Sequence, residues 1–201
     1  MLVTEILSNE HRVIEQMLDC LDHWVDDSEA TGHCDWPTAG RILDFLNSFA
    51  DGCHHGKEEE KLFPMMEAHG FSKQMGPTAV MRSEHEQGRR YMAQMTSAVE
   101  QGPRGNASAL SKFAEAAKAY GAMLRTHIQK EDHCLFPMAE QALTEFEKIE
   151  LMRQFEVTEH RPDLEGEHEK YLRFAHDLAQ RYGVKRVKSC ELHHVPCCGH
   201  A

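Results

Sequence analysis

Hydrophobic residues recur along most of the chain at alternating steps of three and four, which is the period of an amphipathic α-helix. The first such stripe runs through Leu7, Ile14, Leu18 and Val25. Proline and glycine interrupt this period and divide the chain into five predicted helices, which begin near residues 3, 35, 77, 106 and 144. The pattern therefore predicts an all-α protein, an antiparallel up-down four-helix bundle with an additional C-terminal helix.

The predicted helices divide the chain into three parts. Residues 1–142 are expected to form the bundle, residues 143–183 a helical extension that packs on it, and residues 184–201 a Cys/His-rich tail. Pro162 is expected to break or kink the helix of the extension.

The composition fits one globular domain, because 201 residues of which 41% are hydrophobic suffice to bury a core. A net charge of −11 argues against nucleic acid as a partner, since phosphate binding needs a clustered positive surface. No apolar run approaches the roughly 20 residues of a membrane span, and the N-terminus lacks a signal-peptide pattern. The seven cysteines have scattered spacing typical of reduced thiols. We therefore expect a cytoplasmic protein without a membrane partner.

Histidine is the unusual component of this sequence, with 15 residues. It is the commonest side-chain metal ligand. Each of the first four apolar stripes contains one histidine, namely His11, His54, His85 and His127. A single core histidine is usually a hydrogen-bonded structural residue, but four in consecutive helices indicate a shared site.

The two halves of the chain repeat one motif. Residues 54–64 read HHGKEEEKLFP and residues 127–137 read HIQKEDHCLFP, at an offset of 73 residues (127 − 54). In this alignment Glu58 matches Glu131, and each half has a lone histidine on its preceding helix. The chain therefore reads as two helical hairpins, each with a lone His followed by a His-x-x-x-Glu.

The spacing within this motif has a chemical reason. Residues four apart lie one turn apart on nearly the same face of a helix, so His54 and Glu58 would project into one interior, as would His127 and Glu131. Two unpaired carboxylates in an apolar core would be costly, whereas divalent cations would neutralise them and bind their oxygens. These ligand types suit iron, but they also suit manganese, cobalt or zinc.

The paired motifs, with their shared Lys-Glu and Leu-Phe-Pro context, make the chain resemble the hemerythrin-like HHE cation-binding proteins over about residues 5–140. This resemblance implies a four-helix bundle with a non-haem centre of two carboxylate-bridged Fe ions. It also implies that Glu58 and Glu131 bridge the irons, and that the terminal ligands are His11, His54, His85 and His127.

The sequence departs from the oxygen-carrying hemerythrins at one position. Those proteins have a second histidine four residues after the ligand of the third helix, where this chain has Arg89. Water, another side chain or nothing would then fill that coordination position, which argues against reversible oxygen transport. The pattern is more similar to bacterial proteins linked to repair of damaged iron–sulfur centres and nitric oxide stress. It is also similar to the iron- and oxygen-sensing domain of a eukaryotic ubiquitin-ligase subunit.

Three features leave alternatives open. His55 with Glu59 is a shifted copy of the motif, although the repeat alignment favours His54 with Glu58. Glu59 or Glu60 could be an extra ligand, but a solvated helix face is favoured for both. His168 lies in the apolar line of the fifth helix, where a hydrogen-bonded core histidine is favoured over a supplementary ligand. The tail from Cys190 to His200 could hold a second metal ion or respond to redox changes, but a tail without either role is favoured.

The function that these patterns favour is binding of, or reaction with, a small ligand such as O₂, NO or peroxide, in a stress response or in iron or oxygen sensing. The alternatives are iron storage or delivery, repair of iron–sulfur centres, and reversible O₂ binding. The sequence leaves open whether the protein is an enzyme, and whether it has a protein partner or forms a homo-oligomer.

Overall fold

A computed structural model describes residues 2–159 and 167–187 of the chain, and every element within these ranges is helical. The predicted all-α class is therefore confirmed. In chain order the elements are α1 (Thr4–Thr31), α2 (Trp36–Phe45), η1 (Leu46–His55), η2 (Glu58–Leu62), α3 (Phe63–Ala68), α4 (Pro77–Gln101), η3 (Gly102–Arg104), α5 (Ala109–Lys130), η4 (Glu131–Leu135), α6 (Phe136–Ala142), α7 (Glu145–Glu159) and α8 (Glu167–Tyr182). Among the described residues, no helix combines the length and the apolar composition that crossing a membrane requires.

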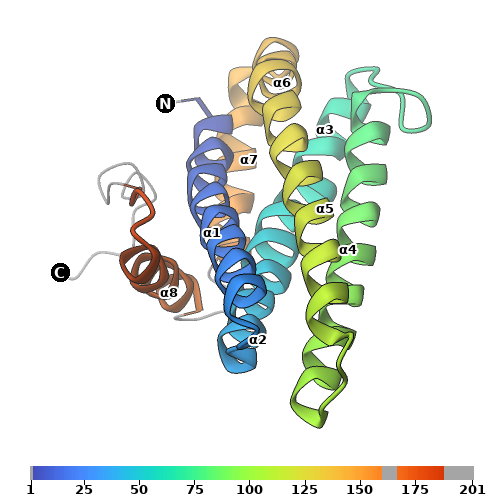
Figure 1. The fold of residues 1–201 in the computed structure, drawn as a ribbon. Coiled ribbons are helices and arrows are strands. Elements are labelled where there is room, and N and C mark those ends of the chain that lie inside the picture. The colour runs from blue at the N-terminus through green and yellow to red at the C-terminus, as the bar shows by residue number, and fades with distance from the viewer. Residues whose placement is uncertain (1, 160–166, 188–201) are drawn as a thin grey trace, which may run out of the picture.

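The main elements form four rods that lie side by side, with successive rods running in opposite directions (Figure 1). The first rod is α1, the second runs from α2 through η1 and η2 to α3, the third is α4, and the fourth runs from α5 through η4 to α6. α1 packs against α5, α5 against α4, α4 against η1, and η1 against α1, so that the rods enclose one interior.

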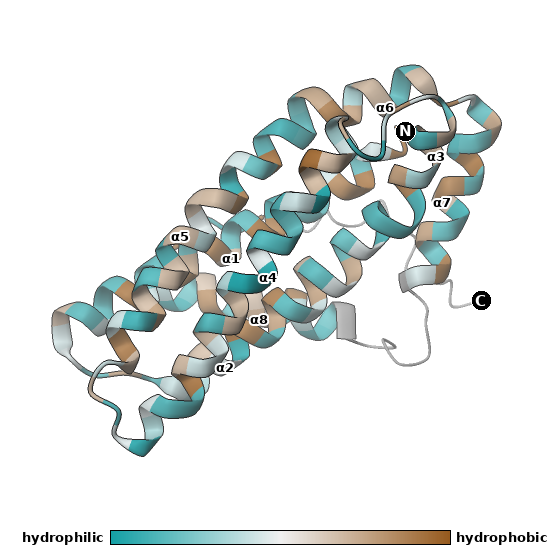
Figure 2. Cartoon of the chain, turned by 90° about the vertical axis from the view of Figure 1, so that its right-hand side faces the viewer, coloured by the Kyte–Doolittle hydropathy of each residue, from teal (hydrophilic) through white to brown (hydrophobic). Residues whose placement is uncertain are grey.

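Two hydrophobic clusters fill this interior. One includes Trp24 and Phe113, and the other includes Leu7 and Phe136. Burying each such side chain contributes about 1.5–3 kcal/mol relative to leaving it exposed. Figure 2 shows the matching sequence pattern, because hydrophobic and hydrophilic residues alternate along the helices. In α1, His11 lies between residues of the two clusters, so the polar site predicted from the sequence separates them.

Residues that favour the end of one helix and the start of the next define the turn between the first two rods. α1 ends at Gly32, whose φ of 68° is in the left-handed region that favours glycine. Asp35 then caps α2, because its carboxylate accepts the backbone N–H of Thr38 at 3.2 Å. Pro37 stands in the first turn of that helix, where its missing N–H costs nothing.

The three segments η1, η2 and η4 are π-helical, whereas the sequence predicts continuous α-helix there. η2 and η4 occupy matching positions in the repeat. In η2 the N–H of Phe63 donates to the carbonyl of Glu58, and in η4 the N–H of Phe136 donates to that of Glu131. The residue after each phenylalanine is a proline, which has no N–H and sterically displaces the carbonyl four residues earlier. The wide turn therefore begins at the two glutamates of the repeated motif.

The C-terminal extension consists of two helices in the described part of the chain. α7 contributes Leu151 and Phe155 to one hydrophobic cluster, whereas α8 contributes Phe174 and Leu178 to the other. Figure 1 shows α8 outside the four rods, and Figure 2 shows α7 at one edge of the molecule. Three features of the sequence lie outside the described residues: Pro162, the side chain of His168 and the tail Cys190–His200.

Candidate metal centre

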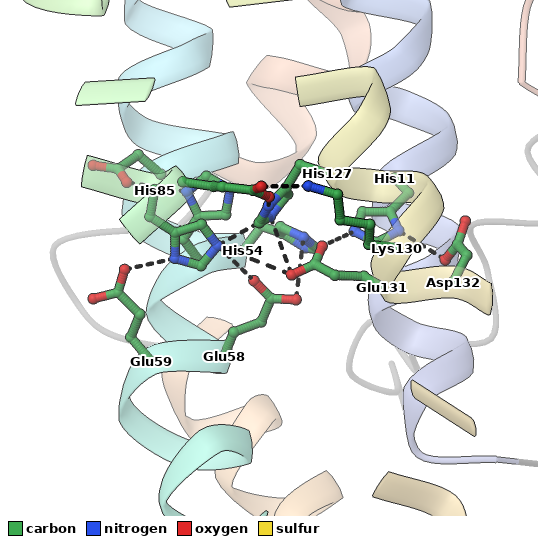
Figure 3. A network of polar contacts seen from close by, with 12 residues as sticks. His11, His54, Glu58, Glu59, His85, His127, Lys130, Glu131 and Asp132 are labelled. Carbon is green, nitrogen blue, oxygen red and sulfur yellow. Dashed lines mark hydrogen bonds and ion pairs between the residues drawn. The ribbon is translucent and has the colours of Figure 1, made fainter. Parts of the chain in front are cut away.

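Seven side chains that could bind a metal ion meet between the two hydrophobic clusters (Figure 3). Six of them are the ligands predicted from the sequence, and each is at most 1% exposed: His11, His54, Glu58, His85, His127 and Glu131. All four rods contribute, through α1, η1, η2, α4, α5 and η4. The seventh is His55, which is 3% exposed. The structure thus brings every residue of the predicted set together and adds one.

These side chains form two overlapping clusters, and within each the candidate ligand atoms lie within 4.8 Å of one another. The three-histidine cluster consists of His55, His85, His127 and Glu58, and the two-histidine cluster consists of His11, His54, Glu58 and Glu131. Glu58 belongs to both clusters, so they cannot be two independent sites.

Each of the two glutamates directs one carboxylate oxygen toward each cluster. The distances to the facing imidazole Nε2 atoms are 3.1 Å from Glu131 Oε1 to His127, 3.2 Å from Glu131 Oε2 to His11, 3.4 Å from Glu58 Oε2 to His85, and 3.7 Å from Glu58 Oε1 to His54. A carboxylate whose two oxygens diverge in this way is suited to bridging two cations.

The other ring nitrogen of every one of the five histidines lies beside a carboxylate. From Nδ1 to the nearest carboxylate oxygen, the pairs are His54 with Glu10 at 2.9 Å, His127 with Glu84 at 2.9 Å, His11 with Asp132 at 2.9 Å, His85 with Glu59 at 2.6 Å, and His55 with Asp51 at 3.1 Å. A proton on Nδ1 that donates to the carboxylate leaves the lone pair of Nε2 facing the interior. This is the tautomer that a metal-binding histidine needs.

The carboxylates beside the Nδ1 atoms also repeat between the two halves of the chain. Glu10 forms an ion pair with Lys57, and Glu84 forms the matching pair with Lys130. The surroundings differ, because the Lys57 side chain is 0% exposed and that of Lys130 is 41% exposed. Phe155 of α7 covers the first pair, with its ring centroid 5.9 Å from Nζ of Lys57. The extension therefore covers the Glu10–Lys57 pair, whereas the Glu84–Lys130 pair is partly exposed.

His55 is a candidate that the sequence interpretation considered in a shifted copy of the motif but did not favour. Successive residues of an α-helix point about 100° apart, so a His-His doublet is expected to turn only one ring inward. Both His54 and His55 are nevertheless buried within η1. The ring of His55 stacks on that of His85, with centroids 3.8 Å apart. The His54-His55 doublet was the sign of this residue in the sequence. It points to His55 only if the helix is known to be π-helical there.

Two neighbouring residues have roles that the sequence did not predict. Glu59, for which a solvated helix face was favoured, has a side chain only 23% exposed and binds His85. Arg89, at the position of the missing fifth histidine, binds the carboxylates of Asp51 and Glu59. Another histidine, His55, lies beside His85 in the same cluster.

The electrostatics of this interior are unfavourable for two free carboxylates. Burial raises the pKa of Glu58 well above its usual value, and the charge of Glu131 raises it further. Burial also acts to raise the pKa of Glu131, but His127 and His11 beside it hold that pKa well below its usual range. Burial lowers the pKa of His54 to about 4, which favours a neutral imidazole. The interior thus stabilises one carboxylate as an anion and disfavours the second.

Polar atoms without a hydrogen-bond partner of suitable geometry are concentrated at this centre. Among the described residues they include both oxygens of Glu58 and Glu131, and Nε2 of His11 and His55. Each such buried atom costs about 1–3 kcal/mol. Bound cations would supply the missing partners and neutralise both carboxylates. The residues present therefore fit a pair of metal ions.

Comparison with known proteins agrees with this geometry. Residues 2–139, more than half of the chain, match the hemerythrin HHE cation binding domain. The chain belongs to this family. The matched range of the hemerythrin domain includes all seven side chains of the centre and ends before α7 and α8. Metal binding by the His/Glu cluster is the property that this membership supports.

Similar proteins occur in mycobacteria. The chain is 26% identical over 157 residues to proteins of Mycobacterium tuberculosis strain H37Rv and of Mycobacterium bovis, both named only as uncharacterized proteins. The match covers 78% of this chain and 61% of those proteins, so the hemerythrin-domain chain spans about three fifths of the length of these relatives. No solved structure matches the chain.

Proposed function

We propose that the chain is a hemerythrin-type four-helix bundle that holds two non-haem iron ions, bridged by Glu58 and Glu131. The histidines of the three-histidine cluster would bind one iron, and those of the two-histidine cluster the other. The observation that carries this proposal is that each glutamate directs one oxygen toward each cluster. The carboxylate beside every Nδ1 atom supports it further, because metal-binding histidines usually have such a partner.

The function that fits this centre is binding of, or reaction with, a small ligand such as O₂, NO or peroxide, in a response to oxidative or nitrosative stress or in iron or oxygen sensing. Bound iron would supply the exchange of electrons with that ligand. The chain supplies charge neutralisation and two apolar clusters that exclude water. The two-histidine cluster has one imidazole fewer, so we expect the ligand to bind on its side.

His55 favours a second candidate function, reversible O₂ binding. Arg89 at the position of the missing histidine argues against such binding, because one nitrogen ligand is lost. His55 restores five histidines to the centre. The experiment below therefore includes O₂ release as an outcome.

Metal analysis of protein purified without a tag or added metal tests the di-iron centre directly. We expect two irons per chain. A ratio near one zinc per chain without iron would contradict the proposal, and several ions per chain that chelators remove easily would favour iron storage or delivery instead.

Anaerobic reconstitution with ferrous iron, followed by optical spectra after separate addition of O₂, NO and peroxide, identifies the ligand. Rapid bleaching by peroxide would favour turnover, and a stable nitrosyl spectrum would favour a role in nitrosative stress. An oxygenated spectrum that disappears under vacuum would favour reversible O₂ binding. If none of the three ligands changes the spectrum, the proposed function is wrong.

Replacing His55 with alanine is expected to weaken binding of one of the two ions. Because His55 contributes a nitrogen ligand to the three-histidine cluster, we expect at least about a tenfold loss of affinity for that ion. Competition with a chelator measures the loss. His133→Ala is the matched control, since His133 is an exposed histidine in η4 whose ring binds Gln129, outside the centre. Equal affinities in both variants would exclude His55 as a ligand.

A further inference from the structure

Arg89 lies on α4 one turn after His85, at the surface edge of the three-histidine cluster. Its side chain is 33% exposed. Nε donates to the two oxygens of Asp51 at 3.0 and 3.1 Å, Nη2 donates to Glu59 at 2.8 Å, and Nη1 donates to Glu86 at 2.7 Å. A planar guanidinium can hold several carboxylates in fixed directions, which a lysine ammonium cannot do.

Two of these carboxylates also hold histidines of the centre. Asp51 lies 3.1 Å from Nδ1 of His55, and Glu59 lies 2.6 Å from Nδ1 of His85. The rings of these two histidines stack on each other. The guanidinium of Arg89 therefore binds both carboxylates that hold these two imidazoles, and the imidazoles come from different rods.

The other half of the chain contains a matching arrangement with the charges exchanged. Arg12 and Glu15 form an ion pair at 2.9 Å on α1, and at an offset of 74 residues (86 − 12) they correspond to Glu86 and Arg89. Arg12 binds Asp132, which lies 2.9 Å from Nδ1 of His11. Each arginine thus supports the lone histidine of its own hairpin through a carboxylate of the other hairpin.

The two arginines differ in what they reach. Arg12 binds one carboxylate, which holds one histidine of the two-histidine cluster. Arg89 binds two carboxylates, which hold two histidines of the three-histidine cluster. One of these histidines is His55. Arg89 therefore binds, from α4, the carboxylate that lies beside His55 of η1.

We propose that Arg89 is a positioning residue for the three-histidine cluster, where it holds His55 and His85 with Nε2 directed at the metal ion through Asp51 and Glu59. Arg12 has the same role for His11 in the two-histidine cluster. This inference rests on the proposed metal centre, and it assigns each arginine to one of the two ions. Because both arginines are partly exposed, their replacement opens no cavity in the core, so the variants are expected to fold.

The test uses cobalt(II), whose visible absorption reports its coordination, in the full chain. The wild type is expected to bind two cobalt ions. Arg89→Met should weaken one of them about tenfold in chelator competition and change its spectrum. Arg12→Met should weaken the other one. Arg89→Lys should resemble Arg89→Met, because a lysine cannot bind both carboxylates in the same geometry.

A double-mutant comparison separates positioning from a general structural effect. In a His55→Ala background, Arg89→Met should cause less further loss of affinity than it does alone. In a His11→Ala background, the about tenfold effect of Arg89→Met should persist. Arg12→Met should show the opposite dependence. Equal effects of Arg89→Met in the two backgrounds, or a wild-type spectrum and affinity in Arg89→Met, would overturn the inference. If the wild-type chain itself binds no pair of ions, the proposed function fails instead.

Discussion

Replacing Glu58 and Glu131 together with glutamine is expected to abolish binding of both metal ions. A glutamine has nearly the same size, but it lacks the negative charge that neutralises the cations and it does not bridge them. We expect each ion to bind at least about a hundredfold more weakly, beyond the range typical of changes to supporting residues. Metal analysis after reconstitution, together with the optical spectrum, measures the loss.

The matched control is Glu60→Gln, which removes an exposed charge from the same π-helical segment and should leave both ions bound. The metal-free Glu58→Gln single variant should have a melting temperature at least as high as the metal-free wild type, because burial and the charge of Glu131 disfavour the Glu58 carboxylate when no cation is present. Two irons with an unaltered spectrum in the double variant would mean that these glutamates are not the bridge. A large loss of stability of metal-free Glu58→Gln would mean that the Glu58 carboxylate is structural.

Replacing Glu10 with alanine is expected to destabilise the metal-free protein by about 3 kcal/mol. The change removes a carboxylate from the ammonium of Lys57, which lies in the interior with a side chain that is 0% exposed. For a chain of this size the loss corresponds to a fall in melting temperature of roughly 6–12 °C. Thermal unfolding followed by circular dichroism measures it.

The repeat provides the matched control for this prediction. Glu84→Ala removes the equivalent partner of Lys130, whose side chain is 41% exposed and can be hydrated by water. We expect a loss below about 1 kcal/mol. Both variants also remove the partner of a histidine, so the difference between them reflects the different surroundings of the two lysines. Similar losses in the two variants would show that α7 contributes nothing to the energetics of the Glu10–Lys57 pair.

The sequence was sufficient to predict the helical class and six of the seven side chains of the centre, for a definable reason. The amphipathic period identifies the buried face of a helix. The repeat then decided which of the possible His-x-x-x-Glu pairs faces the interior. His54 with Glu58 and His127 with Glu131 could be chosen because the same spacing to a Leu-Phe-Pro occurs twice. Those residues lie in the interior, where the pattern predicts them.

His55 could not be predicted in the same way. The register argument assumes α-helical geometry, in which neighbours cannot both face the interior, and no repeat partner exists because position 128 is Ile128. Wide helical turns depend on the prolines and on packing between rods, which a period of 3.6 residues does not describe. The sequence also could not distinguish Lys57 from Lys130, because only the position of α7 over Lys57 separates their environments.

Neither hairpin contains all the side chains of either cluster. The three-histidine cluster combines His55 and Glu58 of the first hairpin with two histidines of the second, and the two-histidine cluster needs Glu131 of the second. During synthesis on the ribosome, therefore, the centre cannot assemble until Glu131 has left the exit tunnel. Before that point the emerging first hairpin presents His54, His55 and Glu58 without their partners, so in the proposed centre the metal ions would bind only after the later half has docked.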